Sequence, residues 1–311
     1  MVRFDKVTSD RGAQYVDDRR GAGGGGGRRR AVAGRGGAVG GGFGLILLII
    51  GALFGIPALS GGAGGLGLET TGTFDAGQID APAGPTGIDP DAELVEFMEA
   101  LMFDVQDTWD QYFDQAGLTY EFSTLVIFED VVDSGCGRAT SAVGPFYCPA
   151  PDDQSVYLDL DFFDDLARRF GAPGDFAQAY VIAHEIGHHV QTITGISDQV
   201  RAAQAQDPAN RNAYTILQEL QADCLAGVWG FSANQRLTVE TGVPIIERGD
   251  IAEGIAAAQA VGDDRIQEQA GLEITPETWT HGSAEQRVRW FEIGLDTGDP
   301  EACDPFSVDN P

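Results

Sequence analysis

The stretch Ala183-His-Glu-Ile-Gly-His-His189 contains three of the four histidines of this 311-residue chain. His184 and His188 are four residues apart, so on a helix they share one face and can bind the same cation. Glu185 is turned about 100° away around that helix, where its carboxylate can reach a metal-bound water instead of the metal. The pattern predicts a helical Zn²⁺ site that serves hydrolysis, most directly of a peptide bond.

A third metal ligand has to come from another part of the chain. Catalytic zinc takes three protein ligands and keeps one position open, and no histidine lies between His189 and His281. Glu219 is the candidate, and Asp223 lies one turn later on the same face of the predicted helix, where it can accept the free ring N–H of a histidine ligand. The surrounding segment is largely apolar, which favours buried, paired carboxylates over a solvated acidic face.

The net charge of −29 is unevenly distributed. Residues 1–41 contain nine of the 19 basic residues and four of the 48 acidic ones, so the remainder carries 10 basic and 44 acidic side chains. An acidic body repels phosphate, so we expect no nucleic-acid partner. Its acidity fits a solvated surface, with a preference for cationic substrates or life at high salt as the alternatives.

The first 88 residues predict three segments ahead of the folded body. Residues 1–42 are rich in glycine and arginine, which predicts a disordered, basic, cytoplasmic segment. Residues 43–60 are uncharged and long enough for one transmembrane helix, and residues 61–88 predict a linker. All nearby basic residues precede the apolar run, so we expect a single-pass cell-membrane protein with residues 89–311 outside the cytoplasm and the lipid bilayer as a partner.

Two other interpretations of the apolar run stay open. The small residues around Ala58-Leu59-Ser60 resemble a signal-peptide cleavage site, although the leader would be unusually long. Export by a twin-arginine route is the other alternative.

The body predicts an α+β fold that is mainly helical with a small antiparallel sheet. Apolar periodicity and β-branched runs place the elements. The expected helices are 91–115, 162–170, 176–194, 210–232, 251–261 and 284–295, and the expected buried strands are 124–128 and 156–160.

At the level of motifs, Glu219-x-x-Ala-Asp223 after His184-Glu-x-x-His188 resembles the gluzincin arrangement. More closely, the chain resembles the bacterial "putative neutral zinc metallopeptidase" family over nearly its whole length. The motifs that carry this resemblance are Val16-Asp-Asp-Arg-Arg-Gly21, Gly144-Pro-Phe-Tyr-Cys-Pro149, Val156-Tyr-Leu-Asp-Leu160 and Thr280-His-Gly-Ser-Ala-Glu-Gln-Arg287. It implies that His184, His188 and Glu219 bind zinc, that Glu185 is the general base and that Asp223 supports a histidine ligand.

A donor to the oxyanion of the reaction is less well defined. The segment after Thr280 resembles one in membrane-bound zinc peptidases, so His281 or Arg287 could serve as this donor. Alternatively, His281 orients the final helix, with Ser283 as its N-cap. Tyr147 and Tyr157 are weaker candidates, since a tyrosine beside a strand is more often core. His189 is expected to face away from the metal.

The four cysteines all follow the apolar run. Cys136 and Cys148 flank a short loop and are expected to form a disulfide, which leaves Cys224 to pair with Cys303. A cysteine zinc ligand is the weaker alternative, because the chain has no C-x-x-C spacing.

These observations support two function classes. The first is a membrane-anchored zinc endopeptidase that acts on a protein or peptide substrate. The second is a non-catalytic zinc-binding scaffold or regulatory module that keeps the zincin fold. Glu185 favours the first class, because a site that only binds zinc has no use for a base.

Overall fold

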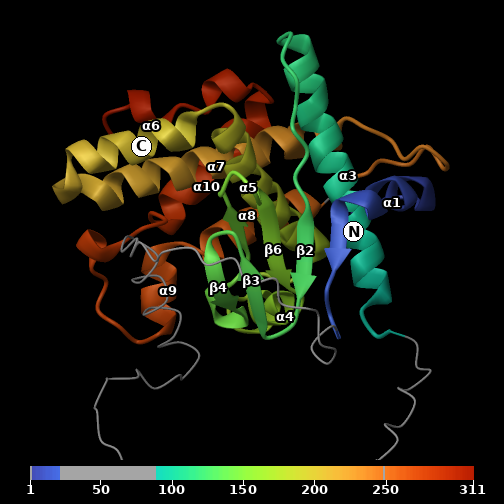
Figure 1. Ribbon diagram of the computed structural model, residues 1–311, viewed down its shortest axis with the longest axis horizontal. Helices are drawn as coiled ribbons and strands as arrows, with labels where there is room; N and C mark the ends of the chain where they lie inside the picture. Colours follow the sequence, from blue (N-terminus) through green and yellow to red (C-terminus); the bar gives the residue numbers. More distant parts are fainter. Residues whose placement is uncertain (1, 22–88, 248) are drawn as a thin grey trace, which may run out of the picture.

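The computed structural model describes residues 2–21, 89–247 and 249–311. Helices predominate in these ranges, which confirms the mainly helical α+β prediction (Figure 1). The helices are α1 Lys6–Gly12, α3 Ala92–Gln115, α4 Asp161–Arg168, α5 Asp175–Ile193, α6 Ile196–Gln206, α7 Arg211–Asn234, α8 Asp250–Ala260, α9 Asp263–Gln269 and α10 Ala284–Thr297. The strands are β1 Val16–Asp18, β2 Leu125–Phe128, β3 Val131–Ser134, β4 Gly137–Thr140, β5 Phe146–Cys148 and β6 Ser155–Asp159.

The main sheet is mixed, so the prediction of an antiparallel sheet is wrong. Its strand order is β1-β2-β6-β5, with β1, β2 and β6 parallel and only β5 antiparallel to its neighbour. The chain between β2 and β6 forms the separate β3–β4 hairpin and then β5, and this long connection lets β6 run in the direction of β2. All residues of β2 and β6 are buried, as is usual for parallel strands covered on both faces.

Helix α5, which carries the histidine motif, lies in the interior against α7 and α8, with α10 packed on α7. Glycines permit these close approaches. A Cβ at Gly187 would lie 3.0 Å from the Ala222 carbonyl oxygen on α7, and one at Gly294 of α10 only 1.9 Å from the Cys224 oxygen. Larger residues would separate the helices, so these glycines allow α7 to contact α5 and α10 directly.

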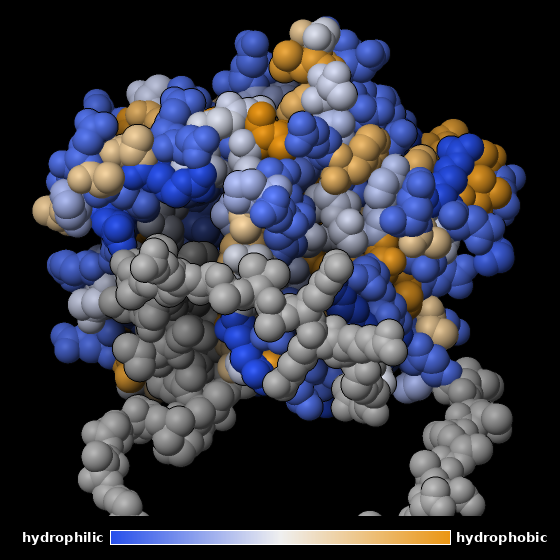
Figure 2. Space-filling model, viewed as in Figure 1, coloured by the Kyte–Doolittle hydropathy of each residue, from blue (hydrophilic) through white to orange (hydrophobic). Residues whose placement is uncertain are grey.

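The outer surface is polar. Figure 2 shows hydrophilic residues over most of the visible face, with apolar residues in small groups. This agrees with an acidic, solvated exterior around the apolar interior.

Residues 2–21 are folded, so the prediction of disorder for all of 1–42 is wrong for this part. Strand β1 pairs with β2, and α1 packs on α3 (Figure 1). The segment contains apolar residues of its own, and Val2 is buried. Its composition differs from that of the glycine-rich run that begins after residue 21, and an average composition over residues 1–42 does not show this difference.

Among the described residues, no helix is long and apolar enough to cross a membrane. The predicted transmembrane helix 43–60 and the linker 61–88 lie outside the described residues.

Both predicted disulfides are confirmed. Cys136, in the turn between β3 and β4, bonds Cys148 at the end of β5, and Cys224 of α7 bonds Cys303 in the C-terminal segment. They close very different lengths of chain, since the partners are 12 and 79 residues apart.

Removing each disulfide should therefore have a different cost. Cys224→Ala/Cys303→Ala is expected to lower the free energy of unfolding by about 4.5 kcal/mol, and Cys136→Ala/Cys148→Ala by about 3 kcal/mol, because the longer loop restricts the unfolded chain more. Urea denaturation of the two double variants measures the difference. An equal or reversed order would contradict the chain-entropy explanation.

Candidate metal centre

Helices α5 and α7 bring three predicted ligands together. The Nε2 atom of His184 is 3.2 Å from Oε2 of Glu219, and Nε2 of His188 is 3.4 Å from Oε1 of the same carboxylate. Tetrahedral zinc with ligand bonds of about 2.0–2.1 Å separates its ligand atoms by about 3.3 Å. Both nitrogen–oxygen distances match this value, and the two nitrogens and the carboxylate oxygen all lie within 4.8 Å of one another.

The site also keeps a route to solvent. The side chains of His184, His188 and Glu219 are 8%, 15% and 15% exposed. A structural zinc site is usually closed by four protein ligands, whereas a catalytic site keeps an open position for water or substrate. Three ligands with partial exposure fit the catalytic kind.

The ring of His184 is oriented by Asp223, as predicted. Nδ1 of His184 is 2.8 Å from Oδ1 of Asp223, which leaves Nε2 directed at Glu219. Asp223 in turn accepts hydrogen bonds from the Tyr180 hydroxyl and from two nitrogens of Arg287, at 2.8 and 2.9 Å. Arg287 therefore binds behind His184, on the side away from Glu219, and supports a ligand instead of an oxyanion.

This network keeps its groups charged. Burial alone would raise the pKa of Asp223, but Arg287 and His184 outweigh it and lower that pKa to about 2. Burial lowers the pKa of His184, yet Asp223 and Glu219 together raise it to about 9 in the metal-free protein. The pKa of Glu219 lies well below its usual value because the two histidines offset the effect of burial. Both carboxylates are therefore ionised at neutral pH.

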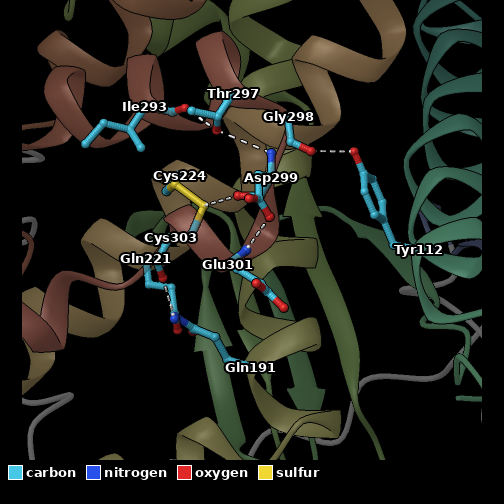
Figure 3. The surroundings of a disulfide bond; sticks show 10 residues. All are labelled: Tyr112, Gln191, Gln221, Cys224, Ile293, Thr297, Gly298, Asp299, Glu301 and Cys303. Atoms are coloured by element: carbon cyan, nitrogen blue, oxygen red, sulfur yellow. Dashed lines mark hydrogen bonds between the residues drawn. A yellow bond between two sulfur atoms is a disulfide. The ribbon is translucent and has the colours of Figure 1, made fainter. Parts of the chain in front are cut away.

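The ring of His188 is oriented by a residue that the sequence did not reveal. Nδ1 of His188 is 2.9 Å from Oε1 of Gln191, and Nε2 of Gln191 donates to the Gln218 carbonyl and to Oε1 of Gln221. Gln221 donates to the carbonyl of Cys303 at 2.8 Å, beside the disulfide to Cys224 (Figure 3). A chain of hydrogen bonds thus connects His188 to the C-terminal segment.

The Glu185 side chain is placed differently from the ligands. The residue is only 8% exposed, and within the described part of the chain its carboxylate has no hydrogen bond or ion pair. It is close enough to His188 to influence the charge of that ring. Its carboxylate oxygens are not among the fully buried, unpartnered polar atoms of the described residues, so solvent reaches this group beside the metal ligands.

His281 lies beside the same centre, on the loop before α10. The charge of Glu219 helps to raise the pKa of His281, and the charge of His281 helps to lower the pKa of Glu219. Its Nδ1 is 3.2 Å from Oδ1 of Asp263, and Oδ2 of Asp263 accepts the backbone N–H groups of Thr280, His281 and Gly282. Asp263 thus holds both the loop and the ring, and nothing in the sequence around it had indicated this role.

Other sequence predictions around the site have clear outcomes. Ser283 forms a capping box with Gln286 at the start of α10, as predicted. His189 faces away from the metal ligands, as predicted, and contacts the Tyr147 hydroxyl and the Glu121 carbonyl. The hydroxyl of Tyr147 makes that contact and the hydroxyl of Tyr157 donates to Asp153, so both bond to groups other than the metal ligands.

A family comparison agrees with this geometry. The family described as "Putative neutral zinc metallopeptidase" matches residues 6–306. The chain belongs to this family. The match includes α1 and β1 as well as the zinc helices, so the N-terminal segment is part of what the family shares.

Two individual relatives show the extent of the similarity. The chain is 42% identical over 265 residues to "Uncharacterized protein YpfJ" of Escherichia coli (strain K12), covering 85% of this chain and 86% of the relative. It is 50% identical over 186 residues to "Uncharacterized protein Rv2575" of Mycobacterium tuberculosis (strain ATCC 25618 / H37Rv), covering 58% of this chain and 61% of the relative. No solved structure matches the chain.

The orientation of His188 by Gln191 is testable through zinc affinity. Gln191→Leu should weaken zinc binding about 10- to 100-fold, because His188 loses the acceptor that fixes its tautomer and ring angle. Chelator competition measures the affinity without requiring activity. Gln178→Leu, on the same helix, is the matched control and should bind zinc like the unmodified protein. Equal affinities of the two variants would show that Gln191 does not orient the ligand.

Proposed function

We propose that the protein is a zinc-dependent endopeptidase in which Glu185 is the general base. The observation that supports this most strongly is the Glu185 carboxylate, which has no hydrogen bond or ion pair among the described residues and acts on the charge of His188, one of three side chains spaced for zinc. A site that only stored or sensed zinc would not need this carboxylate. The fold alone would not distinguish catalysis from scaffolding.

Each residue has a separate task in this mechanism. When bound, zinc supplies a Lewis acid that polarises the scissile carbonyl and makes water more acidic. The Glu185 carboxylate accepts a proton from the attacking water and delivers it to the leaving amine. His281 donates Nδ1–H to Asp263, and the carboxylates of Asp263 and Glu219 favour its cationic form, in which Nε2–H is the donor to the developing oxyanion.

The sheet supplies an edge for the substrate. Among the described strands, β5 pairs only with β6, and its Tyr147 contacts His189 of α5, so this strand lies beside the zinc helix. An extended peptide can pair with such an edge by main-chain hydrogen bonds. This supports a peptide or protein as the substrate.

Replacing the base should separate zinc binding from hydrolysis. Glu185→Gln is expected to bind zinc normally but to lose about 10²- to 10⁴-fold in kcat/KM, because the amide cannot accept the proton. A peptide library with zinc content measured in parallel gives both values, and Glu93→Gln on the exposed start of α3 is the matched control. If the unmodified protein binds zinc but cleaves no more than Glu185→Gln, the scaffold function is the correct one.

His281 should affect the reaction but not the metal. His281→Ala is expected to lower kcat about 10²-fold with zinc affinity unchanged, since an oxyanion donor acts in the transition state. Asp263→Asn, which weakens the hold on the ring, should give a smaller loss. Loss of zinc from His281→Ala would instead assign His281 to the maintenance of the metal site.

A further inference from the structure

We propose that residues 2–21, the N-terminal segment, and residues 89–311, the zinc domain, form one folded unit on the same side of any membrane. A topology in which the chain crosses a bilayer once between them is therefore excluded. The proposal replaces the single-pass topology expected from the sequence and is independent of whether the site is catalytic.

The first support is the sheet. Val16, Asp17 and Asp18 pair in parallel register with Leu125, Val126 and Ile127, and the N–H of Arg19 continues the ladder to the Ile127 carbonyl at 2.8 Å. Strand β2 is fully buried. Without β1, its backbone edge would lose these partners, which is costly for buried polar groups and leaves an edge prone to pairing with other chains.

The second support is the contact of α1 with α3. Gly12 lies directly on the backbone of α3, where an added Cβ would be 1.7 Å from the Glu99 carbonyl oxygen. The buried Ser9 donates to the Glu99 carboxylate at 3.0 Å, and the rings of Phe4 and Phe97 lie 5.9 Å apart. Backbone contact of this kind requires tight packing, so the segment belongs to the core of the domain.

The third support is an ion-pair cluster that joins the N-terminal segment to the first residues of the zinc domain. Arg20 is 10% exposed and binds Asp18, Asp89 and Asp91 at 2.7–2.8 Å. Burial opposes the charge of Arg20, but its hydrogen bonds to Asp18 and Asp89 raise its pKa above the usual value. The N–H of Gly21 also donates to Glu129 after β2. Several charges held by one partly buried arginine are worth more than an isolated surface pair.

This cluster sets the topology. The described chain stops at Gly21 and resumes at Asp89, and the side chains of Arg20 and Asp89, at these two ends, are in direct contact, 2.8 Å apart. A single crossing would separate them by the hydrocarbon core, about 30 Å thick. The same separation would arise if the N-terminal segment docked onto the zinc domain of a second copy of the chain, because both copies would have the same orientation in the membrane.

The proposal is tested in cells that express the full chain. Asp10→Cys on α1 and Asp114→Cys on α3 each place one thiol at an exposed position. All four native cysteines are in disulfides, so only the new thiol reacts. A membrane-impermeant maleimide applied to intact cells, and again after lysis, should label both variants or neither in the intact state. Labelling of one and protection of the other in intact cells would overturn the proposal.

A cross-link tests the docking itself. In the variant Ser9→Cys/Glu99→Cys the two thiols should form a disulfide on oxidation. The chain is then cut at a protease site inserted between residues 61 and 88. The two fragments should migrate together on a gel run without reductant. Ser9→Cys/Asp114→Cys is the control, since the positions on α3 are 15 residues, or about 22 Å, apart. Matching maleimide labelling without a cross-link specific to Glu99 would refute the docked unit, and a specific cross-link with matching labelling supports it.

Discussion

The carboxylate of Asp223 is the interaction on which the site depends. It is fully buried and joins three helices, because it binds Tyr180 and His184 of α5 and Arg287 of α10. Burying such an ion pair gains little net stability, but removing one partner typically costs about 3–5 kcal/mol because the other charge is left unpaired. The network therefore fixes the rotation and height of α7 against α5, which places Glu219, one turn earlier on α7, against the two histidines.

The two histidine rings are held by different parts of the chain. His184 is oriented through Asp223 from α10, and His188 is oriented through Gln191 and Gln221 from the segment around Cys303. The Cys224–Cys303 disulfide joins that segment to α7. The last 30 residues, which include none of the zinc ligands, thus support both ends of the ligand set, and this explains how sequence changes far from the motif can affect the metal.

The sheet connects this centre to the start of the chain. Strand β5 lies beside α5 at one edge, and β1 from the N-terminal segment forms the other edge. Between them, β2 and β6 are buried on both faces. A zinc domain taken from residue 89 onward lacks one edge of its own sheet, so a study of its activity should retain residues 2–21.

Local spacing determined what the sequence could predict by itself. His184 and His188 are four residues apart, as are Glu219 and Asp223, and a helix turns each such spacing into a shared face. The pairing of Cys136 with Cys148 followed from a short loop, and the buried strands followed from apolar runs. The tertiary structure alone decided the role of Gln191, the hold of Asp263 on His281, the position of Arg287 behind His184, the mixed sheet and the docking of β1. Most of these features join residues that helix packing and strand order bring close in space. The role of Gln191 depends on which side chain meets which histidine ring. No periodicity in the sequence encodes such contacts.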